Sequence, residues 1–269
     1  MSDTRVHRPA DLGRQIGVIS AVVFMIIAAM VGTGLFGGTN VRELQGGALD
    51  ADATYLAPAT QAFSIWTAIY ILMVAYAIWQ AFPAQRSRVR QRAAGWWVAV
   101  TAVLNGGWLL AAQFLNLPMT VLAIVVLLIA LAVTIRVLTV QPSEGWQDAV
   151  FLDLTVGLHL GWVALATVAN VTAWLTAEVV PASWGDAADF WGIAVLLVVG
   201  FIGIALALGT KGRLAPAIAM SWGLAWIAVG RSTGEPQSLP IAIAAGVVAA
   251  VVLLVAVVIR LILARSTPD

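Results

Sequence analysis

Residues 93–135 have the sequence AAGWWVAVTAVLNGGWLLAAQFLNLPMTVLAIVVLLIALAVTI, which contains no charged side chain. A helix needs about 20 apolar residues to cross the hydrocarbon core of a bilayer, so this stretch is long enough for two crossings. Proline interrupts a helix, and the segment Asn116-Leu117-Pro118 lies near the middle of the stretch. We therefore predict two consecutive membrane helices, at about 94–115 and 118–139.

The composition of the whole chain also points to a membrane. Of its 269 residues, 61% are hydrophobic and 10% are charged, whereas average soluble chains carry about 25% charged residues. The net charge of +1 argues against the basic surface that nucleic-acid binding requires. The absence of cysteine removes disulfides, thiolate metal sites and cysteine nucleophiles, and two histidines leave little for a metal centre. The chain is unusual in having 12 tryptophans.

Uncharged stretches of sufficient length predict about eight membrane helices in all. The other six are expected at about 15–38, within 53–85, and at about 149–175, 190–210, 214–230 and 239–263. The first run follows several arginines, as in a signal peptide, but it is about 20 residues long and lacks a small-residue cleavage pattern. We interpret it as a retained span.

The distribution of positive charge predicts the orientation. Positively charged residues concentrate in cytoplasmic loops, and all 14 Lys and Arg residues except Arg42 and Arg231 fall on one side of the predicted spans. We therefore expect a multi-pass protein of the inner cell membrane with both termini in the cytoplasm. The opposite face is acidic, and its longest loop, at about 39–57, is either a solvated connection or a cover over a cavity mouth.

Three of the predicted helices carry aromatic and amide residues at helical spacing. The second contains P-x4-F-x2-W-x3-Y within PATQAFSIWTAIY, the third contains L-N-x-x-W, and the fifth contains GWVALATVANVTAW. Residues four apart share a helix face, so each helix presents one stripe. The stripes consist of Trp66 and Tyr70; Asn105 and Trp108; and Trp162, Ala166, Asn170 and Trp174.

In this order and on these helices, the patterns resemble the TspO/MBR family, the tryptophan-rich sensory proteins related to the mitochondrial translocator protein. The resemblance covers about residues 16–176 and implies a five-helix bundle that binds porphyrins, other tetrapyrroles or, in some members, sterols. It divides the all-α chain into a cytoplasmic N-terminus at 1–15, a TspO-like bundle at 16–176, and three additional membrane helices with a short cytoplasmic tail at 177–269. The family's proline-tyrosine pair in helix five is here Leu158-His159, and its W-Y-x-x-L segment before Pro58 is missing.

The resemblance implies a ligand pocket, to which we add the histidine inside the fifth span. Tryptophan faces stack on a flat conjugated ligand, although ordinary packing gives the same pattern. The two asparagines either contact ligand or hydrogen-bond between helices, and the histidine either contacts ligand, including haem iron, or is a hydrogen-bonded core residue, which we favour. The candidate ligand-binding residues are Trp66, Tyr70, Asn105, Trp108, His159, Trp162, Ala166 and Asn170.

Other unusual residues have structural explanations. An interfacial aromatic belt accounts for the tryptophans near predicted span ends, which are Trp96, Trp97, Trp146, Trp184 and Trp191. Asp153 lies about one turn inside the fifth span, and Arg136 lies near the end of the preceding span. We expect these two residues to form an ion pair.

We expect an integral membrane protein that binds a hydrophobic ligand, such as a porphyrin or haem-type tetrapyrrole, in a sensing or regulatory role. We predict neither catalytic residues nor a metal site. The lipid bilayer and the small-molecule ligand are the expected partners, nucleic acid is not, and a homodimer stays open. The alternatives are a secondary transporter of small hydrophobic molecules, a light-dependent porphyrin-degrading enzyme, and a scaffold that recruits a partner.

Overall fold

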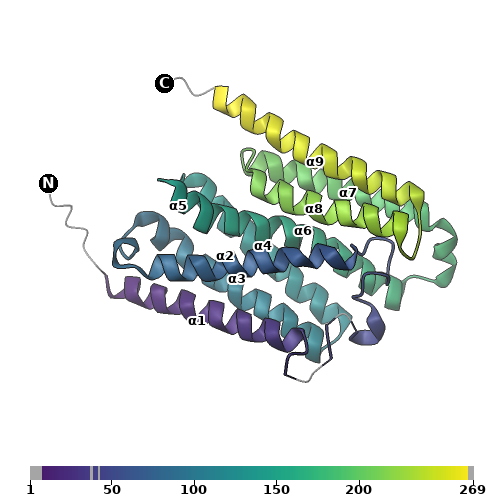
Figure 1. Ribbon diagram of the computed structural model, residues 1–269, viewed down its shortest axis with the longest axis horizontal. Coiled ribbons are helices and arrows are strands. Elements are labelled where there is room, and N and C mark those ends of the chain that lie inside the picture. The colour runs from purple at the N-terminus through teal and green to yellow at the C-terminus, as the bar shows by residue number, and fades with distance from the viewer. Residues whose placement is uncertain (1–7, 37–38, 42, 266–269) are drawn as a thin grey trace.

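A computed structural model describes residues 8–36, 39–41 and 43–265. Within these residues, eight helices are long and apolar enough to cross a membrane, which confirms the all-α polytopic prediction. Figure 1 shows that they lie side by side along the long axis of the molecule. The main helices are α1 (Pro9–Gly32), α2 (Ile65–Ala81), α3 (Val89–Phe114), α4 (Leu117–Val140), α6 (Thr155–Trp174), α7 (Ala188–Gly209), α8 (Leu214–Thr233) and α9 (Leu239–Arg265).

The helix boundaries follow local chemistry. The helix α4 begins at Leu117 because the Asn116 side chain accepts a hydrogen bond from the Met119 backbone N–H at 3.1 Å, and Pro118 occupies the first turn. The short 3-10 helix η2 (Thr60–Ser64) leads into α2, and η3 (Pro83–Gln85) separates α2 from α3.

The fifth membrane span is longer than its main helix. It begins with α5 (Trp146–Asp148) and the π-helical turn η4 (Ala149–Leu154), continues through α6, and ends with a second π-helical turn, η5 (Leu175–Val179). The 3-10 helix η6 (Ala182–Ala187) then leads into α7.

The helices form two packed groups. One buried hydrophobic cluster joins α1, α2, α3, α4 and α6, and includes Met25, Ile69 and Leu131. A second cluster joins α7, α8 and α9, and includes Leu224 and Val252. In Figure 1 the helices α7, α8 and α9 lie together along one side of the earlier helices, and α1 begins at the same end of the bundle at which α9 ends.

Glycines allow α8 to approach α6 closely. A Cβ added to Gly161 would lie 2.0 Å from the backbone oxygen of Pro216, and one added to Gly157 would lie 2.6 Å from the Cβ of Ala215. Gly157 and Gly161 are four residues apart and therefore share one face of α6. The same arrangement of small residues commonly permits close helix pairs in membranes. It brings the last three helices against the helix that carries the third aromatic stripe.

The five tryptophans expected in an interfacial belt are exposed. Their exposed fractions range from 38% for Trp97 to 66% for Trp146. Trp96 and Trp97 lie about two turns from the start of α3, and Trp191 lies in the first turn of α7. Exposed indole rings near helix ends are typical of the membrane–water interface.

Candidate functional site

A cavity of about 530 Å³ lies among α1, α2, α3, α4, α6 and the loop that follows α1. It lies toward the end of the bundle at which α1 ends, because Ala29, Gly32 and Leu109 contribute to its wall. All three aromatic stripes face it. The predicted residues that line the cavity are Trp66, Tyr70, Asn105, Trp108, Trp162, Ala166 and Asn170.

Aromatic rings from α2, η2 and α6 form one wall of this cavity. Trp66 stacks on Tyr70 with ring centroids 5.3 Å apart, as expected for residues four apart on one helix. Trp66 also meets Trp162 edge to face at 6.2 Å, and Phe63 meets Trp162 in the same way at 5.7 Å. Such edge-to-face contacts hold each ring in one orientation. The wall therefore consists of rings that pack against one another.

Asn105 connects three helices beside the aromatic wall. Its side-chain oxygen accepts a hydrogen bond from the Tyr70 hydroxyl at 3.3 Å, and its side-chain nitrogen lies 3.5 Å from Nε2 of His159. Asn105 is 1% exposed and lines the cavity. It therefore joins α3 to α2 and α6, and it also presents an amide to the cavity.

Asn170 makes a similar connection between α3 and α6. Its side-chain oxygen accepts a hydrogen bond from the indole N–H of Trp108 at 3.2 Å, and its side-chain nitrogen donates to the backbone oxygen of Ala166 at 2.9 Å. The indole N–H of Trp162, in contrast, is buried and has no hydrogen-bond partner among the described residues. An unsatisfied buried donor is costly, so this N–H lowers the stability gained from burying Trp162.

His159 is the predicted site residue that lies outside the cavity lining. It is 1% exposed, and its ring meets Trp66 edge to face at 5.8 Å. Together with its contact to Asn105, this places His159 behind the wall, where it supports two residues that do line the cavity. The interpretation of His159 as a hydrogen-bonded core residue therefore describes its surroundings better than a direct ligand contact does.

Trp174, the last member of the third stripe, also lies away from the cavity lining. Its indole N–H donates to the Glu178 carboxylate at 3.0 Å. The α6 stripe thus divides into a cavity part, which ends at Asn170, and an outer part at Trp174.

The long loop after α1 supplies a part of the site that no motif indicated. Its members Asn40, Val41, Ala48, Leu49, Asp50, Thr54 and Ala57 line the cavity. Gln45 attaches the loop to α3 by donating to the backbone oxygen of Ala112 at 3.0 Å. Only the length and position of the loop suggested this role. The loop residues show no helical or strand periodicity that would mark them as part of a site.

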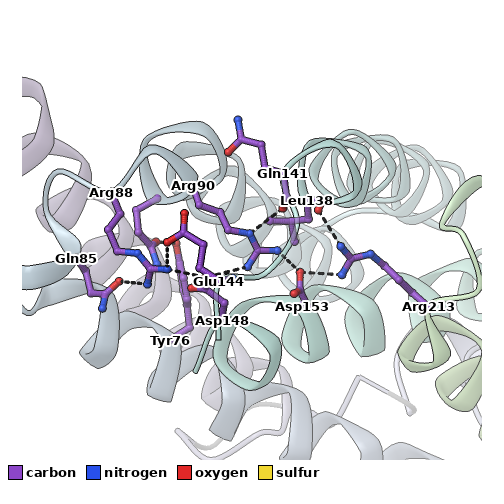
Figure 2. A network of polar contacts seen from close by, with 11 residues as sticks. Tyr76, Gln85, Arg88, Arg90, Leu138, Gln141, Glu144, Asp148, Asp153 and Arg213 are labelled. Atoms are coloured by element: carbon purple, nitrogen blue, oxygen red, sulfur yellow. Dashed lines mark hydrogen bonds and ion pairs between the residues drawn. The ribbon is translucent and has the colours of Figure 1, made fainter. Parts of the chain in front are cut away.

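A network of charges lies at the other end of the bundle, where α3 begins (Figure 2). Asp153 lies between two guanidinium groups and pairs with Arg90 at 2.5 Å and with Arg213 at 2.8 Å. The predicted ion pair between Asp153 and Arg136 is therefore wrong. The side chain of Arg136 is exposed, whereas α3 and the start of α8 bring the two partners of Asp153 inward.

Arginines at the start of α3, which contribute to the predicted orientation in the membrane, also form ion pairs within the fold. Arg88 pairs with Glu144 at 2.6 Å and with Asp148 at 2.7 Å. Burial lowers the pKa of Arg88, but hydrogen bonds to these two carboxylates outweigh it and raise the pKa above its ordinary value. Arg92 pairs with Asp11 of α1 at 2.6 Å. Ion pairs therefore connect the helices at this end of the bundle.

Comparison with known proteins supplies one match. A family model described as TSPO-like protein matches residues 14–259, a range that includes nearly all of the eight spans. No curated protein and no solved structure matches the chain. Among the described residues, no group of three or more His, Asp or Glu side chains is placed to hold a metal ion.

Proposed function

The chain belongs to the TSPO-like family, and from this premise we propose that it binds a flat, hydrophobic ligand of the tetrapyrrole class in a sensing or regulatory role. The observation that carries the proposal is the aromatic wall of Phe63, Trp66 and Trp162 on a cavity of about 530 Å³. Small-molecule sites are typically apolar clefts of about 300–1,000 Å³ with a few polar groups that fix orientation.

The chemistry of the lining favours a conjugated ring. Indole and phenol faces attract flat π-systems through stacking and edge contacts. The amides of Asn105 and Asn170 are polar groups of the lining that can orient such a ring. Because aromatic packing already holds the wall in place, binding requires little ordering of side chains, and this favours affinity.

Among the described residues, the cavity lining contains no histidine that can serve as an axial ligand to the metal of a bound tetrapyrrole. His159, the one histidine in the part of the chain that the structure describes, does not line the cavity but contacts the lining residues Asn105 and Trp66. We therefore expect a metal-free porphyrin to bind about as well as its iron complex. The protein contributes a shaped apolar surface and hydrogen bonds rather than a bond to iron.

Titration of purified protein with protoporphyrin IX tests the proposal. We expect saturable binding, monitored by the shift of the porphyrin Soret band, and at least about a tenfold weaker affinity when Trp66→Ala and Trp162→Ala are combined, because two stacking surfaces are lost. The matched control combines Trp96→Ala and Trp191→Ala, which removes two exposed indoles and leaves the cavity intact. Equal affinity in both double variants would contradict the proposed site.

Two further measurements separate binding from the alternatives. Porphyrin absorbance that falls under illumination but not in the dark would indicate breakdown of the ligand, and ion flux into proteoliposomes that depends on porphyrin would indicate transport. We expect neither. A stable, bound porphyrin in the light and the absence of flux are the results that match a sensing or regulatory role.

A further inference from the structure

The loop over the cavity is attached to the last three helices by Arg231 of α8. The Arg231 side chain is 2% exposed, and its guanidinium donates from Nη1 to the backbone oxygen of Thr54 at 3.1 Å and from Nη2 to that of Ala51 at 3.0 Å. The two arms of one guanidinium therefore hold two carbonyls, three residues apart, in the same loop. A rigid planar fork is suited to this geometry, and a lysine ammonium is not.

Apolar packing attaches the same loop segment to the same helix. Leu56 is 4% exposed and belongs to the buried cluster of the last three helices, together with Leu224 and Ile227 of α8. The backbone N–H of Ala59 donates to the backbone oxygen of Trp226 at 3.2 Å. The indole N–H of Trp222 donates to the oxygen of Ala62 at 3.0 Å. The part of α8 from Trp222 to Arg231, about three turns, thus meets the segment from residue 51 to residue 62.

This segment is also a wall of the ligand cavity. Thr54 and Ala57 line the cavity. The side chain of Leu56, between them, packs instead in the buried cluster of α7, α8 and α9. A second, more polar cavity of about 460 Å³ lies between the loop and the end of α8, where Arg231 and the following residue Glu235 contribute to its wall. Asp50 and Thr60 line both cavities. The segment therefore contributes to the walls of both cavities.

We infer that Arg231 is a positioning residue that keeps residues 50–60 in place as this wall, so that the last three helices govern how fast ligand enters and leaves the cavity. The inference rests on the proposed function for its ligand part. When the guanidinium is lost, the carbonyls of Ala51 and Thr54 lose their donors, and the segment opens more often. Only the loop position changes, because Arg231 makes no contribution to the aromatic wall.

Hydrogen exchange of the ligand-free protein in detergent measures the anchoring directly. In Arg231→Lys we expect amides in peptides covering residues 50–60 to exchange about tenfold faster than in the wild-type protein, with unchanged exchange in α2 and α3. The control is Arg213→Lys, which alters a partly buried arginine at the other end of α8, where it pairs with Asp153. That change is expected to leave the exchange of residues 50–60 unaltered.

The ligand part is measured as the rate of protoporphyrin IX release. We expect about tenfold faster release in Arg231→Lys and in Leu56→Ala, which detaches the same segment by a different route. If Arg231→Lys does not fold, Leu56→Ala supplies both measurements. Unchanged exchange at residues 50–60 in the folded variants overturns the inference, and so does faster exchange with unchanged release.

The exchange experiment also keeps this inference separate from the proposed function. If the wild-type protein does not bind porphyrin, the proposed ligand is refuted. The exchange contrast between Arg231→Lys and Arg213→Lys then decides alone whether α8 anchors the loop.

Discussion

Replacement of Gly161 by alanine probes the contact between the two groups of helices. The added Cβ would lie 2.0 Å from the oxygen, 2.7 Å from the carbonyl carbon and 2.8 Å from the Cα of Pro216. All three atoms belong to the backbone, so no side-chain rotation relieves the clash. Ordinary van der Waals contact begins at 3.4 Å, and α6 and α8 must therefore separate by about 1.4 Å at this point.

The expected cost follows from two opposing effects. Overpacking of a well-packed core costs about 1–3 kcal/mol, and a rigid backbone clash belongs at the upper end. Alanine also favours the helix over glycine by about 1 kcal/mol. We therefore expect Gly161→Ala to lower the free energy of unfolding by about 2 kcal/mol.

Unfolding in mixed micelles of increasing SDS content, followed by circular dichroism, provides the assay. The matched control is Gly246→Ala in α9, where an added Cβ meets nothing within 4 Å, so the control is expected to be neutral or stabilised by up to about 1 kcal/mol. If Gly161→Ala and Gly246→Ala shift the transition equally, α8 does not pack against α6 as described.

Two other predictions concern the charges. Asp153→Asn removes the carboxylate that Arg90 and Arg213 share and is expected to lower stability by about 3 kcal/mol in the same titration, because removal of one partner of a buried ion pair is strongly destabilising. Asp148 remains 3.7 Å from Arg90, which keeps the cost at the lower end of the range for buried pairs. Arg136→Gln, at an exposed position, should change stability by less than about 0.5 kcal/mol. Since the chain has no cysteine, single cysteines report orientation: Ser232→Cys should react with an impermeant maleimide outside intact spheroplasts and Ser143→Cys only after permeabilisation, and the reverse pattern would invert the predicted topology.

Much of the architecture could be predicted from local features of the sequence. The uncharged stretch around Asn116 and Pro118 contains two helices because proline and the asparagine cap both favour a new helix start. The spacing of Trp66, Asn105 and Trp162 placed these residues on single helix faces, and the structure brings those faces to one cavity.

Other features depended on which helices become neighbours. Proximity along the chain suggested Arg136 as the partner of Asp153, but Arg90 and Arg213 reach it from α3 and from the start of α8. His159 belongs to the same helix as Trp162, yet it lies behind the lining because Asn105 and Trp66 cover it. Arg231 counted only as an exception to the charge distribution, although it holds the loop over the cavity.

The sequence by itself therefore determined which segments enter the membrane and which side chains share a helix face. These properties depend on the hydropathy and periodicity of each segment, which are local. Only the tertiary structure decided which faces meet and which groups pair, because the burial of His159, the partners of Asp153 and the attachment of the loop to Arg231 depend on residues far apart in the chain. The packing of the helices determines which hydrogen-bond or ion-pair partner a buried charge or donor finds.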